Sequence, residues 1–156
     1  MRILHLLSQT HLTGPEVYVA ALCRRQMADG HHCFIVSDTL SVTTPAEYLA
    51  MAIHHRSLVS RIRNIVRLVR FCRANNIDLI NAHSRAASWL ANVVARITGA
   101  AYVSTLHGRQ SRHAMRRRTN IYGRHIIVVC EHLAGHVTDE LNIRDADVRV
   151  IRNGLE

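Results

Sequence analysis

The stretch Ala101-Tyr-Val-Ser-Thr-Leu-His-Gly108 decides the fold. Its first six residues are of types that favour a buried, pleated strand, and a histidine and a glycine follow directly. In open α/β sheets, ligands bind beyond the carboxyl ends of the parallel strands. An imidazole there can donate and accept hydrogen bonds near neutral pH, and a glycine lets backbone approach a ligand closely. His107 is therefore a candidate functional residue, with the capping of backbone groups as its alternative role.

Strands and helices alternate on both sides of this stretch. Short apolar strands are predicted at 2–8, 33–37, 52–55, 78–83, 101–106, 126–130 and 148–151. Helices are predicted at about 14–29, 45–51, 58–74, 84–98 and 131–142, with Ser84 as an N-cap and Gly99 as a terminator. This alternation indicates an α/β fold, a doubly wound parallel sheet joined by right-handed crossovers.

Two helices carry more specific expectations. Thr13 and Glu16 have the spacing of a capping box, so each is expected to bind a free backbone N–H at the start of the first helix. In the helix 58–74 the expected buried stripe is Ile62, Ile65, Val66, Val69 and Cys72, and the arginines Arg63, Arg67 and Arg70 line another face. A solvated surface is the commoner meaning of such a charged face.

The charge of the chain is strongly positive and unevenly placed. All 20 basic residues are arginines, and the formal net charge is +9. The segment Leu79–Cys130 holds eight arginines and no acid, whereas from Glu131 onward six acids face three arginines. A one-sided basic surface points to an anionic partner, which could be nucleic acid, a phosphorylated substrate or a lipid headgroup.

Cysteine usage and hydropathy indicate a cytoplasmic protein. The four cysteines show neither pairing pattern nor metal-ligand spacing and are interpreted as small buried apolar residues in a reduced compartment. The apolar start 3–7 is too short for a signal-peptide core, and no run approaches the ~20 residues that span a bilayer.

Metal binding and nucleic-acid binding are both disfavoured. His132 and His136 have helical i, i+4 spacing, but residue 133 is leucine rather than glutamate and no third ligand is evident. The neighbouring pairs His31-His32 and His54-His55 would point to opposite faces of a strand. Aromatic residues make up only 4% of the chain, so stacking platforms for single-stranded nucleic acid are lacking.

Five segments, taken in order, resemble the motifs of family 4 glycosyltransferases. Thr13-Gly-Pro-Glu16, before a helix ending Gln26-Met-Ala-Asp-Gly-His31, is similar to the opening "GG-x-E … L-A-x-x-G-H". Asp78-Leu-Ile-Asn-Ala-His-Ser84 resembles "D-x-(I/V)-x-x-H-S", and Ser104-Thr-Leu-His-Gly108 resembles "T-x-H-G". Ile127-Val-Val-Cys-Glu131 looks like "(I/V)-x-V-S-E", and 148–155 looks like the interdomain "V-x-V-I-P-N-G-(I/V)". Their order and spacing together carry the resemblance.

The resemblance implies the N-terminal half of a retaining, metal-independent GT-B enzyme. Residues 1–151 would form a Rossmann-like acceptor-binding domain, and 152–156 would begin the linker to a C-terminal domain that binds the nucleotide-sugar donor. His107 would lie beside the transferred sugar and the acceptor hydroxyl. Gly14 would face the donor phosphates, and the further substrate-binding candidates are His83, Ser84, Gly108 and Arg109.

Three departures from the family pattern bear on this reading. Pro15 stands where a second glycine is usual, which removes one N–H that could bind phosphate. Cys130 stands where serine is usual, and Arg152 where proline is usual. The expected function is transfer of sugar to an anionic or lipid-linked acceptor, with the nucleotide-sugar as co-substrate and no further cofactor.

Four arginines just past His107 are expected to attract an anionic membrane at the inner face: Arg112, Arg116, Arg117 and Arg118. Two alternatives remain open. One is half of a GT-B sugar-nucleotide epimerase, which shares the architecture but needs no acceptor. The other is a basic nucleic-acid-binding α/β module.

Overall fold

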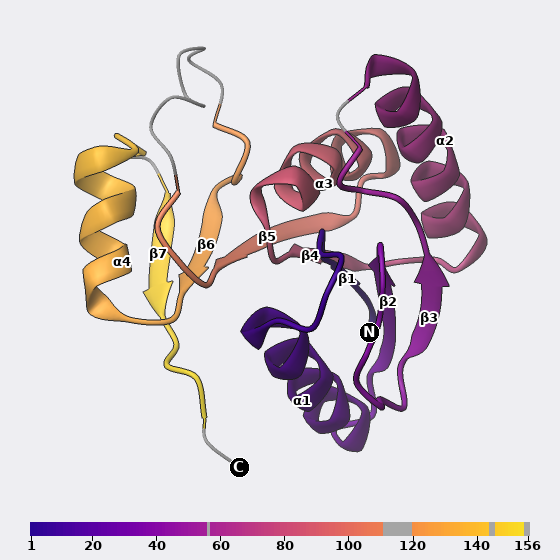
Figure 1. Ribbon diagram of the computed structural model, residues 1–156, viewed down its shortest axis with the longest axis horizontal. Helices are drawn as coiled ribbons and strands as arrows, with labels where there is room; N and C mark the ends of the chain where they lie inside the picture. Colours follow the sequence, from indigo (N-terminus) through magenta and orange to yellow (C-terminus); the bar gives the residue numbers. More distant parts are fainter. Residues whose placement is uncertain (56, 111–119, 144–145, 155–156) are drawn as a thin grey trace.

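The computed structural model describes residues 1–55, 57–110, 120–143 and 146–154. In these residues the strands form one sheet in the order β3-β2-β1-β4-β5-β6-β7, and every neighbouring pair is parallel (Figure 1). Their bounds are β1 Arg2–Leu6, β2 His32–Ser37, β3 Glu47–Ala50, β4 Leu79–Ala82, β5 Ala101–Leu106, β6 His125–Val128 and β7 Asp147–Val150. The predicted α/β fold with a parallel sheet is confirmed.

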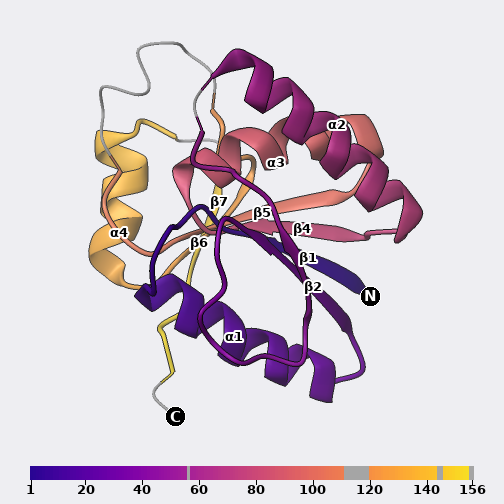
Figure 2. The same ribbon diagram turned by 45° about the vertical axis from the view of Figure 1, so that its right-hand side comes forward.

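Helices lie on both faces of the sheet. Helix α1 (Gly14–Ala28) covers one face, and α2 (Leu58–Ala74) and α3 (Arg85–Thr98) cover the other (Figure 2). Helix α4 (Glu131–Gly135), continued by the π-helical turn η2 (His136–Glu140), packs against β6 and β7. The sheet is therefore doubly wound, as predicted.

Alternation along β1 shows why the sheet needs both layers. Ile3 packs in one apolar cluster with Val19 and Cys23 of α1. Leu4 and Leu6, on the opposite face, pack in a second cluster with residues of α2 and α3. Because successive side chains of a strand point to opposite faces, this strand needs cover on both sides. His5, in the same strand, therefore faces α1.

The region after β2 differs from its prediction. The helix expected at 45–51 and the strand at 52–55 are wrong, since the strand is Glu47–Ala50 and pairs in parallel with β2 from Phe34↔Glu47 to Ser37↔Ala50. The hydroxyl of Tyr48 donates to the carbonyl oxygen of Ser37 at 3.2 Å. This edge strand is mostly exposed and has too little alternation of apolar residues to be recognised from the sequence. Its pairing with β2 therefore decides its conformation.

Helix α2 has the predicted length but a different orientation about its axis. Its buried residues are Asn64, Leu68 and Cys72, whereas Ile62 and Val66 are 54% and 43% exposed. The amide of Asn64 donates to the carbonyl oxygen of Ala52 at 2.8 Å, which holds a polar residue on the inner face. The expected buried stripe is therefore partly wrong, and the apolar residues Leu58, Val59, Ile62 and Val66 form an exposed surface, the outer face of α2.

Glu16 has another role than the predicted capping box. Thr13 makes no side-chain cap, and its hydroxyl donates to Gln9 Oε1 at 2.9 Å. The buried carboxylate of Glu16 accepts from the backbone N–H groups of Ser41 and Val42 and from Gln9 Nε2. It thereby ties α1 to the loop after β2. The Glu16 carboxylate therefore binds backbone amides of a distant loop instead of the N–H group at the start of its own helix.

Other local predictions hold or fail individually. Ser84 caps α3 by accepting from the N–H of Ala87 at 3.2 Å, and Gly99 ends the helix at φ +79°. Cys23, Cys33 and Cys72 are buried as expected, but Cys130 is exposed. No helix among the described residues is both long and apolar enough to cross a membrane.

Candidate functional site

Three histidines meet at the carboxyl ends of neighbouring strands. His5 lies in β1, His83 directly follows β4, and His107 directly follows β5. These strands are adjacent in the sheet, and the register pairs His5 with Asn81, two residues before His83. Side-chain alternation then places all three rings on the α1 side. Tyr18 of α1 contacts the His107 ring edge-on, with the ring centroids 4.9 Å apart.

Hydrogen bonds join the three rings into a chain that ends on α1. His107 Nε2 lies 3.1 Å from His83 Nδ1, and His83 Nε2 lies 3.0 Å from His5 Nδ1. His5 Nε2 lies 2.8 Å from Gln26 Oε1. We call these four residues the histidine chain.

The amide oxygen of Gln26 sets the direction of every bond in the histidine chain. This oxygen can only accept, so His5 must donate from Nε2. With one proton on each ring, His5 then accepts at Nδ1. The same reasoning makes His83 donate from Nε2 and His107 donate from Nε2. The Nδ1 lone pair of His107 consequently remains an acceptor, and no described residue donates to it.

Burial keeps the rings of His83 and His107 neutral. His5 and His83 are buried, and His107 is partly buried. Burial, and secondarily the neighbouring rings of His5 and His107, lowers the pKa of His83 well below its ordinary value. Burial lowers the pKa of His107 to about 4. At neutral pH the site therefore presents an uncharged acceptor rather than an imidazolium donor.

Two thiols lie at the Gln26 end of the histidine chain. The Cys33 thiol donates to Gln26 Oε1 at 3.3 Å. The hydrogen bond from Cys23 lowers the pKa of Cys33, with smaller contributions from His5 and His31, while burial opposes the shift. The same contact, with burial, raises the pKa of Cys23.

His5, Cys23 and Cys33 could also hold a metal ion. Their ligand atoms lie within 4.8 Å of one another, and all three residues are buried. A site of one imidazole and two thiolates suits zinc or Cu(I). Hydrogen bonds to Gln26 already satisfy His5 and Cys33, so the fold does not require an ion here. The expectation of no metal remains a prediction.

The other predicted site residues are distributed around the same edge of the sheet. Gly14 is exposed at the start of α1, one helical turn before Tyr18, so it shares the carboxyl edge with His107. Ser84 is engaged as the cap of α3, and the carbonyl oxygen of Gly108 accepts from Gln110 Nε2 at 3.1 Å. Arg109 forms an ion pair with Glu140.

Two further groups of residues were considered in the sequence analysis. Arg112, Arg116, Arg117 and Arg118 lie outside the described residues. His136 Nε2 accepts from the backbone N–H of Gln110 at 3.0 Å, and its Nδ1 lies 3.1 Å from Glu140. His132 is exposed on α4.

His83 changes its role, and two members of the histidine chain escaped the sequence analysis. Both ring nitrogens of His83 are engaged, so it supports His107 and has none free for substrate. His5 and Gln26 were missed because each lies inside a regular element, 21 residues apart. A histidine within an otherwise apolar strand was the one available signal, since a buried imidazole needs partners.

Comparison with known proteins identifies the family of this chain and structures that share its fold. Residues 12–156 match the family model described as Glycosyltransferase Family 4. No curated protein matches the sequence significantly. Among solved structures, a glycosyltransferase from Rickettsia africae superposes with a TM-score of 0.84 at 17% identity, covering 99% of this chain and 43% of that protein.

Two further structures extend the comparison. Alr3699/HepE from Anabaena in complex with UDP-glucose has a TM-score of 0.78 at 15% identity, covering 100% of this chain and 44% of that protein. The lipopolysaccharide outer core galactosyltransferase WaaB has a TM-score of 0.74 at 11% identity, with 100% and 46% covered. The chain thus spans less than half the length of these three proteins, and at such identities they show the shared fold alone.

Proposed function

Because the chain belongs to Glycosyltransferase Family 4, we propose that it is the acceptor-side domain of a retaining, nucleotide-sugar-dependent glycosyltransferase. The observation that carries the proposal is the family match across residues 12–156. The same match disfavours the epimerase and the nucleic-acid-binding module, since the matching model describes transferases.

The donor would bind mainly to a second domain. The Anabaena relative was solved with UDP-glucose, and this chain covers 44% of it. A nucleotide-sugar is therefore the proposed co-substrate here, without a further cofactor. The departing nucleoside diphosphate must be stabilised electrostatically, which is commonly a large catalytic contribution, and in this proposal most of those groups belong to the second domain.

His107 would orient a hydroxyl at the junction of donor and acceptor. Its neutral ring, held by the histidine chain, offers Nδ1 as an acceptor at the carboxyl edge of the sheet. A sugar or acceptor hydroxyl that donates to this nitrogen would be fixed in one orientation. A pKa of about 4 makes His107 too weak a base to remove the acceptor proton alone.

The division of labour predicts weak nucleotide binding by this domain alone. Calorimetry with UDP on residues 1–156 is expected to show a dissociation constant no tighter than about 1 mM, a binding free energy near −4 kcal/mol. A chain that includes the following domain should bind at least tenfold more tightly. Micromolar binding of UDP to residues 1–156 would contradict the proposed acceptor-side role.

We also propose that the domain lies at the inner face of an anionic membrane and receives a lipid-linked or anionic acceptor. The outer face of α2 exposes Leu58 and Val59 by 70% and 76%. The helix carries five arginines and no acid. An exposed apolar strip beside arginines is the pattern of a helix that lies in the headgroup region.

Replacing Leu58, Val59 and Ile62 together with serine is expected to reduce co-sedimentation with anionic vesicles by at least fivefold, because apolar insertion is lost while every charge is kept. The matched control changes the exposed Val17 of α1 to serine and should bind as the original chain does. Equal sedimentation of all three proteins would refute attachment through α2.

A further inference from the structure

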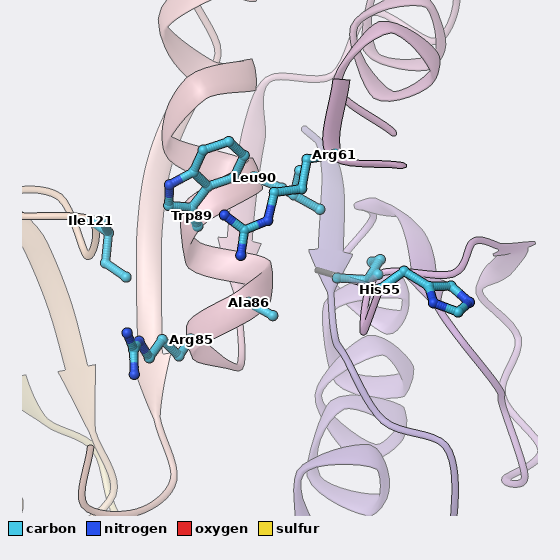
Figure 3. Close-up of a pocket in the computed structure, with 8 residues that line it drawn as sticks. His55, Arg61, Arg85, Ala86, Trp89, Leu90 and Ile121 are labelled. Carbon is cyan, nitrogen blue, oxygen red and sulfur yellow. The ribbon is translucent and has the colours of Figure 1, made fainter. Parts of the chain in front are cut away.

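Figure 3 shows a pocket of about 350 Å³. It lies beside α2 and α3, on the sheet face opposite the histidine chain. Its polar lining comes from His55 in the loop before α2, Arg61 in the first turn of α2 and Arg85 at the start of α3. Trp89, Leu90 and Ile121 supply apolar walls. Arg85 follows His83 by two residues, so the pocket and the histidine chain share the carboxyl edge of the sheet.

The described lining of the pocket is positively charged. Among the described residues no carboxylate lines it, and neither Arg61 nor Arg85 forms an ion pair. Between residues 48 and 130 the only acid is Asp78, whose carboxylate accepts from the backbone N–H of Arg2. The two guanidinium groups beside this cavity therefore favour the binding of an anion that comes from outside the domain.

Trp89 organises one of these cations. The Arg61 guanidinium lies 4.8 Å from the centre of the indole ring, a cation–π contact that fixes the long arginine side chain. Figure 3 shows Arg85 below the indole and the Arg61 guanidinium, with its own guanidinium directed away from α3. The indole also offers an apolar surface beside these charges. This combination favours a ligand with an anionic group and a less polar body.

We propose that this pocket binds the phosphate or diphosphate group of the acceptor. The inference rests on the proposed transferase function and specifies its acceptor as a phosphorylated one. Guanidinium groups match the oxygens of phosphate with paired N–H donors, and a cavity of this volume is in the range of small-molecule sites. The phosphate would lie between Arg61 and Arg85, and the body of the acceptor would contact Trp89.

The protein carries its own probe for this proposal, because Trp89 is its single tryptophan. Titration with inorganic pyrophosphate, and separately with glucose 1-phosphate, is expected to change the fluorescence of Trp89 saturably. Glucose alone should produce no such change. Arg85→Gln and Arg61→Gln should each raise the dissociation constant at least tenfold. This is the loss of affinity typical of removing one charge-assisted hydrogen-bonding partner.

Arg63→Gln is the matched control, since it removes the same charge from the same helix at an exposed position outside the pocket. It should change the dissociation constant less than twofold. Equal weakening by Arg63→Gln and Arg85→Gln, or the absence of saturable binding up to 10 mM, roughly the weakest useful affinity, would overturn the proposal. Thermal melts of each variant establish that it is folded.

Vesicles distinguish the two sources of the phosphate. Phosphatidylcholine vesicles with and without phosphatidic acid serve as the lipid probe. Vesicle binding that Arg85→Gln loses indicates a lipid-borne phosphate, whereas loss of glucose 1-phosphate binding alone indicates a soluble one. Either result supports the proposed phosphate pocket. The proposal is overturned if Arg85→Gln still binds both the vesicles and glucose 1-phosphate. If the full-length enzyme transfers sugar to an uncharged acceptor and Arg85→Gln does not affect this, the transferase proposal stands and the phosphate pocket fails.

Discussion

His107→Ala in the full-length enzyme is expected to lower kcat for sugar transfer about 10²- to 10³-fold. The reason is that a hydroxyl at the reacting centre would lose the acceptor nitrogen that orients it. The KM for the nucleotide-sugar should change little, because most donor contacts belong to the second domain in this proposal. Initial rates of nucleotide release at saturating acceptor measure both quantities.

A second substitution separates orientation from mere structural support. In His107→Gln the side-chain amide can still donate to His83 Nδ1, and its carbonyl oxygen can still accept from a hydroxyl. It should therefore recover at least tenfold of the activity that alanine loses. His132→Ala, at an exposed position of α4, is the control and should leave kcat unchanged. An alanine variant with the original kcat would refute the role of His107.

Acidification from pH 6.5 to 4.5 is expected to destabilise the fold by about 2 kcal/mol through His107, with a further loss through His83. In the unfolded chain a histidine binds its proton near pH 6.5, whereas burial lowers the pKa of folded His107 to about 4. Between these values the unfolded state binds more protons, so stability falls as pH falls. Above pH 7 both states are neutral and the effect vanishes.

Urea unfolding at pH 7.5, 6.5, 5.5 and 4.5 measures this dependence. His107→Gln removes one titrating ring and should flatten the slope, while His132→Ala should keep it. Carboxylates contribute little in this window, because they titrate mainly below about pH 4.5. Arg109 and His136 hold the pKa of Glu140 at about 2, so this acid titrates lower still. A His107→Gln variant with an unchanged slope would show that His107 is not held neutral by the fold.

The sequence by itself determined the features that depend on neighbouring residues. Apolar strands between amphipathic segments predicted the doubly wound sheet, because such strands are stable only when covered on both faces. The Ser84 cap and the Gly99 terminator were predictable, since both satisfy backbone groups within one turn. His107 could be identified as a strand-end residue, and the resemblance to family 4 glycosyltransferases rested on motifs that are themselves continuous in sequence.

Tertiary structure decided what depends on partners far along the chain. Residues 45–51 looked helical, but hydrogen bonding to β2 makes Glu47–Ala50 a strand. Glu16 was expected to cap its own helix, but two amides of a distant loop bind its buried carboxylate. In α2, contact with Ala52 turns Asn64 inward and leaves Ile62 exposed. In each case a long-range hydrogen bond outweighs a local preference worth about 1 kcal/mol or less.

The candidate sites follow the same division. The strand-end position of His107 can be predicted from the sequence. The tautomer of its ring depends on His5 and Gln26, which the fold brings together from β1 and α1. The pocket likewise joins Arg61 and Arg85 from two helices across Trp89. Periodicity places a side chain on a face of its own element, whereas only the packing of one element against another decides which partner it meets.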